Sequence, residues 1–160
     1  MGILQSKSNI TEAVAVIESG KIKGTVVFTQ KDDCVRIKVD VKGLAKNHLH
    51  GFHIHESGDL REGCKSCCAH YNPDKTLHGG IDDGHAGDLG NIKTDEDGVC
   101  SMILKTNKFV VDDILGRSII IHEDEDDLGM GKFDDSQTTG HSGARIACCV
   151  IGISKDGICK

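Results

Sequence analysis

Histidine is the residue type in this chain whose placement suggests chemistry. Six of the nine histidines lie between Leu49 and Asn91. His53 and His55 stand two apart in an apolar, alternating run, and residues two apart in an extended strand project from the same face. Two imidazole rings are therefore expected to meet at one point in space.

Four further candidate ligands follow in a segment rich in Gly, Asp and Asn, which predicts a long loop. They are His70, His78, His85 and Asp88. Long loops are usually functional or disordered, and metal ligands would give this one a reason to be ordered. Several imidazoles with one carboxylate suit zinc or copper, and these four would make a closed tetrahedral set of the structural-zinc kind. Taken singly, each histidine would be a solvated loop residue.

The elements that must position these ligands are short strands. The 160-residue chain has the length of one domain, and its 20 glycines suit many turns. Runs of β-branched residues ended by polar or glycine breaks predict strands at 12–19, 23–30, 34–43, 99–106, 114–123 and 146–153. A second long polar loop is expected at 124–142. Seven or eight antiparallel strands with two long loops predict an all-β sandwich or flattened barrel over 12–160, after a flexible tail at 1–11.

Composition also limits the partners. A net charge of -6 argues against nucleic acid, and no apolar run is long enough to span a bilayer. The first residues lack a basic region followed by an apolar one, so the eight cysteines are not expected to form a secreted disulfide framework. A cytoplasmic location with mostly free thiols is expected. Gly2 and Ser6 fit a myristoylation pattern, but one acyl chain anchors weakly, so no stable membrane association is expected.

Around these residues the chain resembles the copper/zinc superoxide dismutase family. The matching motifs are GFHIHESGD (51–59), HYNP (70–73), HGG (78–80), HAGDLGN (85–91), GRSIIIHEDEDDLG (116–129) and GHSGARIAC (140–148). In order and rough spacing the resemblance runs from about Glu12 to Ile153. It implies a Greek-key sandwich and the dismutation of superoxide to dioxygen and hydrogen peroxide, at a redox-cycling copper ion beside a structural zinc ion.

The resemblance also implies a role for each ligand. The copper ligands would be His53, His55, His70 and His122, and the zinc ligands His70, His78, His85 and Asp88. The shared ring of His70 would release copper on reduction, take up a proton and deliver it to the peroxide. Asp126 matches a carboxylate that hydrogen-bonds His53 and His78 and so orients both rings. Read alone, His122 would be a core histidine bonded to a carbonyl.

Three residues are expected to receive the substrate. Arg145 matches the family residue that holds the anion beside copper, a task that suits a permanently charged, planar guanidinium. Thr139 and Lys132 are expected in the substrate channel. Lys132 is the only lysine or arginine in the second long loop, among many acidic residues. This composition predicts weak electrostatic attraction of superoxide.

The cysteines both follow and depart from the resemblance. It implies a disulfide between Cys64 and Cys148. The chain departs from the family at Cys67, Cys68 and Cys149. Cys64 to Cys67 is also a C-x-x-C pattern, so a redox or soft-metal role stands beside the interpretation in which Cys67 and Cys68 are free thiols.

Two alternatives to the enzyme remain. One is a non-catalytic copper carrier or chaperone on the same scaffold, although the chain carries all the copper ligands and Arg145. The other is a zinc-stabilised binding domain, in which the copper set would have no purpose. A homodimer is expected because Gly58, Gly116 and Ile153 match contact positions, although Ser57 replaces a larger apolar residue there. A copper chaperone is a candidate partner.

Overall fold

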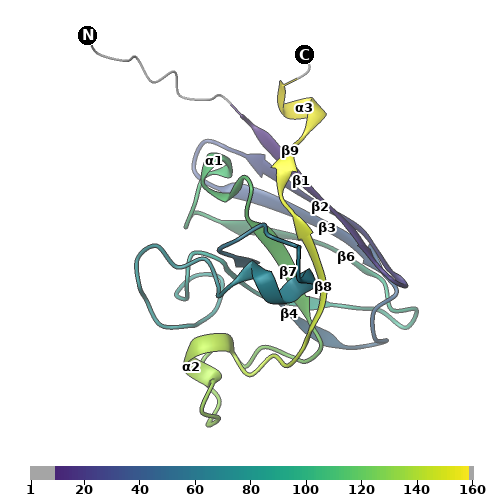
Figure 1. Ribbon diagram of the computed structural model, residues 1–160, viewed down its shortest axis with the longest axis vertical. Helices are drawn as coiled ribbons and strands as arrows, with labels where there is room; N and C mark the ends of the chain where they lie inside the picture. The colour runs from purple at the N-terminus through teal and green to yellow at the C-terminus, as the bar shows by residue number, and fades with distance from the viewer. Residues whose placement is uncertain (1–9, 159–160) are drawn as a thin grey trace.

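The strands form two antiparallel sheets that pack face to face (Figure 1). The computed structural model describes residues 10–158, so Gly2 and the first nine residues lie outside the described part. The five-stranded sheet has the order β6-β3-β2-β1-β9 and the four-stranded sheet the order β5-β4-β7-β8. The first sheet contains β1 (Glu12–Ser19), β2 (Ile22–Gln30), β3 (Val35–Lys42), β6 (Cys100–Thr106) and β9 (Gly152–Ile153). The second contains β4 (Leu49–His55), β5 (Asp88–Lys93), β7 (Ser118–His122) and β8 (Arg145–Val150). The predicted β-sandwich is confirmed.

Alternating side chains define the core. In β3, the side chains of Val35, Ile37, Val39 and Val41 are buried and the intervening residues face solvent. Strands β1 and β2 are joined by a two-residue turn at Gly20, whose φ of 61° favours glycine. The connections from β3 to β4 and from β6 to β7 cross between the sheets, as in a Greek key.

Strand β4 is buried on both faces. Phe52 and Ile54 belong to the hydrophobic core, while His53 and His55 occupy the opposite face and are at most 1% exposed. The 3-10 helix η1 (Gly63–Cys67) and the two long loops gather beside β4, β7 and β8 (Figure 1). The loops therefore cover most of the histidine face and leave these side chains almost fully buried.

Several predicted boundaries were wrong. The strand expected at 114–123 begins at Ser118, after the short helix α1 (Val111–Ile114). The strand expected at 146–153 is two strands, because the chain leaves one sheet as β8 and joins the other as β9. Residues 88–93, which continue the glycine-rich segment, form β5, where pairing with β4 overrides weak strand propensity. The remaining helices are α2 (Ser136–Thr139) and α3 (Lys155–Ile158).

Of the flexible tail expected at 1–11, only residues 10 and 11 lie in the described part of the chain. Ile10 packs against the core, and the Thr11 carbonyl accepts a hydrogen bond of 2.8 Å from Gln30 N. In the described part of the chain, no helix has both the length and the apolar character needed to span a bilayer.

Candidate metal centre

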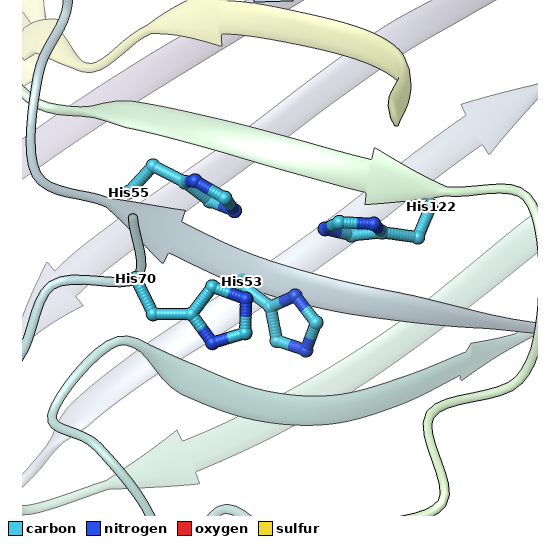
Figure 2. Close-up of side chains that lie close together, drawn as sticks. All are labelled: His53, His55, His70 and His122. Atoms are coloured by element: carbon cyan, nitrogen blue, oxygen red, sulfur yellow. The ribbon is translucent and has the colours of Figure 1, made fainter. Parts of the chain in front are cut away.

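Four buried imidazole rings surround one small space. His53 and His55 come from β4, His122 ends β7, and a β-bridge to His55 places His70 beside them (Figure 2). One nitrogen of each ring lies within 4.8 Å of the others. Nδ1 of His53 and Nε2 of His55, His70 and His122 are buried and have no hydrogen-bond partner among residues 10–158. Four unpartnered nitrogens facing a common point are what a histidine-bound metal requires.

The opposite nitrogen of each ring is engaged, which fixes its orientation. His53 Nε2–H donates to Asp126 Oδ2 at 2.5 Å, and His55 Nδ1–H donates to the Cys68 carbonyl at 2.9 Å. His122 Nδ1–H donates to the Gly143 carbonyl at 3.2 Å. These partners leave the inward nitrogen of each of these three rings free to bind a metal.

A second cluster lies on the other side of His70. The Nδ1 atoms of His70, His78 and His85 lie 2.8, 2.9 and 3.2 Å from the Asp88 carboxylate. The Nδ1 atoms of His70 and His85 are 3.3 Å apart. Ligand atoms about 2.0 Å from a tetrahedral zinc ion would lie about 3.3 Å from one another. The spacing therefore fits zinc.

His53 and His85 compete as the fourth member of the second cluster. By distance alone, His53 also groups with His70, His78 and Asp88. However, His53 Nε2 is engaged by Asp126 and its Nδ1 belongs to the first cluster. His85 has a ring nitrogen near both His70 and Asp88, so it completes the set better.

Burial keeps the first cluster neutral. Burial, with a smaller effect of the neighbouring rings, lowers the pKa of His53 to about 3, of His55 to about 2 and of His122 to about 4. A neutral ring offers a lone pair to a metal. Burial also opposes charge on His78, but hydrogen bonds with Asp126 and Asp88 outweigh it and raise its pKa to about 9.

Asp126 connects the two clusters. Its Oδ1 lies 2.8 Å from His78 Nε2 while its Oδ2 binds His53. Asn91, which sequence reasoning missed, exchanges two hydrogen bonds with the Asp126 backbone, at 2.7 and 2.9 Å. The only sequence signal for Asn91 is its place at the end of the HAGDLGN motif.

A cavity of about 480 Å³ opens beside the first cluster. Its lining includes His55, His70, His122, Thr139 and Arg145. Lys132 is exposed and is not among the lining residues; Asp135 and Thr138 are.

Two carbonyls hold the guanidinium of Arg145 at this cavity. Nη1 donates to Cys64 O at 2.8 Å and Nη2 to Cys68 O at 2.7 Å. Sequence reasoning missed these carbonyls because backbone acceptors leave no pattern in side-chain types.

The disulfide implied by the resemblance is present. Cys64 and Cys148 are bonded and tie η1 to β8. Within residues 10–158, Cys67, Cys68 and Cys149 are free thiols, so the C-x-x-C pattern is not closed into a bond.

Comparison with known proteins agrees with this geometry. The family model for copper/zinc superoxide dismutase matches residues 22–151. A Cu-Zn superoxide dismutase of Paramecium bursaria Chlorella virus 1 is 47% identical over 96% of this chain and 86% of its own length. One from Yarrowia lipolytica is 46% identical over 91% and 99% of the two chains. The crystal structure of the clock protein EA4 superposes with a TM-score of 0.90 at 37% identity, over 95% of this chain and all of its own.

The fold and the paired histidine clusters thus define a copper- and zinc-binding β-sandwich. This chain belongs to the copper/zinc superoxide dismutase family.

Proposed function

We propose that this protein is a superoxide dismutase, converting two superoxide ions and two protons into dioxygen and hydrogen peroxide. The observation that carries the proposal is the set of four unpartnered ring nitrogens, of which those of His55, His70 and His122 belong to residues that line the same cavity as Arg145. Bound copper would supply the electron acceptor and donor for the two halves of the reaction, whereas zinc has no redox chemistry. A carrier needs the nitrogens but has no use for a cation held over the cavity.

The unpartnered atoms assign the ligands. Copper would be held by Nδ1 of His53 and Nε2 of His55, His70 and His122. Zinc would be held by Nδ1 of His70, His78 and His85 with the Asp88 carboxylate. His70 would be shared, one nitrogen for each metal. Asp126 would orient His53 and His78.

Three groups of the chain act on substrate and protons. The guanidinium has five N–H donors, and its two carbonyl bonds leave others for the anion. Thr139 adds a hydroxyl to the cavity wall. His70 Nε2 is the ring atom that would hold a proton for the peroxide, because it borders the same cavity and has no other partner.

The test combines metal analysis with superoxide decay for the Cu,Zn-loaded protein. His55→Ala is expected to lose copper affinity. Arg145→Ala is expected to retain copper but turn over about 10- to 100-fold more slowly, because it loses a charge-assisted hydrogen bond to the anion. Arg61→Ala, at an exposed arginine, is the matched control and should match the wild-type protein. Wild-type protein that binds copper yet leaves superoxide decay unchanged would identify a carrier instead.

We also propose that the protein is a homodimer. Gly116 and Ile153 are exposed, and Ile153 remains 46% accessible in the single chain, as an interface residue would be. Sedimentation should show Ile153→Asp dissociating at concentrations where the wild-type protein and Val16→Asp, at another exposed apolar position, remain dimeric.

A cytoplasmic location, with copper delivered by a chaperone, completes the proposal. Its support is the five free thiols among residues 10–158, since such thiols persist in a reducing compartment. Relatives from Drosophila melanogaster and Haemonchus contortus are named as extracellular enzymes. Fractionation of native cells, with copper loading measured with and without a chaperone, tests both parts.

A further inference from the structure

Lys108 follows the C-terminal end of β6, and its side chain extends to the loop that carries the proposed zinc ligands. It lies between β6 and α1 and directly precedes the buried residue Phe109. Its Nζ donates to the His85 carbonyl at 2.6 Å, the Asp88 carbonyl at 3.1 Å and the Gly80 carbonyl at 3.3 Å. An ammonium has three N–H donors, so these carbonyls use all of them.

The three carbonyls span the segment 80–88. Two belong to residues whose side chains enter the second cluster, and the third opens the turn in which Gly84 N bonds to Gly80 O at 3.0 Å. This segment is rich in glycine and would lose much backbone freedom on becoming ordered around an ion. A lysine that bonds both ends of the segment restricts that freedom in advance.

We propose that Lys108 is a positioning residue for the zinc site, holding the segment 80–88 in its ligand-bearing conformation before the metal arrives. The inference rests on the proposed function, because it takes the second cluster as the zinc site. The side chain acts through the backbone of His85 and Asp88 and is itself no metal ligand.

A purely electrostatic role of Lys108 predicts the opposite change in zinc affinity. The positive charge of Lys108 repels a cation, so its removal should strengthen zinc binding if charge were decisive. If positioning is decisive, its removal should weaken zinc binding because the loop must then be ordered during binding. The direction of the change therefore decides between the two.

The experiment measures the zinc dissociation constant of the full-length protein by competition with a chromophoric chelator, using zinc ions alone. Lys108→Met retains the apolar stem but no donors, and Lys108→Arg restores charge and donors. Lys105→Met, at an exposed lysine of β6, is the matched control. Lys108→Met is expected to raise the constant about 10- to 100-fold, as loss of a group supporting a metal ligand does, with partial recovery in Lys108→Arg.

Two further readouts separate positioning from general damage. The absorption spectrum of cobalt(II) in the zinc site should change in Lys108→Met, and amide hydrogen exchange of residues 80–88 in the metal-free protein should accelerate. The copper dissociation constant should change by less than about threefold, because none of the four histidines of the first cluster lies in the segment 80–88. If Lys108→Met does not fold, Lys108→Gln provides the same comparison.

The proposal would be overturned if Lys108→Met had an unchanged or lower zinc dissociation constant together with an unchanged cobalt spectrum. Equal losses of zinc and copper affinity would also overturn it, since they would indicate only a structural role. None of these measurements uses superoxide, so a failure of the proposed dismutase activity cannot be mistaken for a failure of this inference.

Discussion

At the scale of single residues, Cys68 shows how the backbone serves the site. Its φ of 64° and ψ of -153° lie in a region that is essentially limited to glycine. Its carbonyl accepts hydrogen bonds from both His55 Nδ1 and Arg145 Nη2. These two bonds hold a strained peptide in place, and they join a ring proposed to bind copper to the cation proposed to bind the anion.

Replacing Cys68 by glycine should stabilise the protein. Relief of strain of about 1–3 kcal/mol exceeds the extra unfolded-state entropy of glycine, so the free energy of unfolding should rise by about 1 kcal/mol. Urea unfolding of the metal-loaded protein measures it. Cys68→Ser retains the strain and should match the wild-type protein. Equal midpoints for Cys68→Gly and Cys68→Ser would show that the peptide is not strained.

At the scale of elements, the second long loop sets the charge at the cavity mouth. Residues 124–142 contain six acidic residues and one lysine, and that lysine does not line the cavity. Asp135 and Thr138 do line it. Under the proposed function, the anion would therefore be attracted mainly by Arg145, which lines the cavity.

Raising ionic strength should slow this enzyme less than it slows relatives with lysines in this loop. Thr138→Lys adds a positive charge at the cavity mouth and so tests whether the lack of lysines there causes the weak salt dependence. Thr138→Gln is the control for side-chain size. At low salt, kcat/KM should rise about two- to fivefold in Thr138→Lys, and the gain should shrink as salt screens the charge. A wild-type rate that falls with salt as steeply as that of Thr138→Lys would refute the prediction.

The disulfide also acts between elements, because it joins η1 to β8. Its partners are 84 residues apart, and Cys64 also supplies a carbonyl to Arg145. Cys148→Ser should lower the free energy of unfolding by about 2–5 kcal/mol and slow turnover while copper is retained. Chemical unfolding and metal analysis measure both effects. Cys34→Ser, at a free thiol in the turn before β3, should leave the free energy of unfolding and the turnover unchanged. Equal stability of Cys148→Ser and Cys34→Ser would argue against a stabilising role of the disulfide.

At the scale of the whole molecule, folding buries several ionisable rings. His53, His55 and His122 are at most 4% exposed, and their pKa values fall far below the 6.5 of a free histidine. His78 has a raised pKa of about 9. The sandwich and its covering loops together therefore link stability to pH.

The metal-free protein should lose stability on acidification below pH 6.5. Between pH 6.5 and the lowered values of about 2 to 4, the unfolded chain binds protons that the folded chain excludes, so acid favours unfolding. From pH 6.5 to 5.5, each of the three rings should contribute about 1 kcal/mol, or about 3 kcal/mol in all. His78 acts in the other direction: its contribution is complete below pH 6.5 and is lost as pH rises through about 9.

Urea unfolding of the metal-free protein at pH 5.5, 6.5 and 8 measures this profile. Lys105→Met, at an exposed lysine of β6, is the control and should follow the wild-type curve. Stability that is flat or rises as pH falls from 6.5 to 5.5 would contradict the buried, neutral rings.

The sequence by itself determined the class of chemistry and the class of fold. The two-residue spacing of His53 and His55, the loop ligands and the alternation in β3 are local patterns, and local patterns specify which side chains share a face. They were sufficient to predict the sandwich, and the resemblance added the disulfide, which is present. The ligand sets that the resemblance implies stay a prediction.

Only the tertiary structure decided how distant segments meet. It placed 88–93 in a sheet, divided the last strand between two sheets and brought Lys108 under the zinc loop. It also selected which nitrogen of each ring faces the common space, because the opposite nitrogen is engaged by groups from other segments. These contacts depend on packing between residues far apart in the chain, and no local pattern of residue types records that packing.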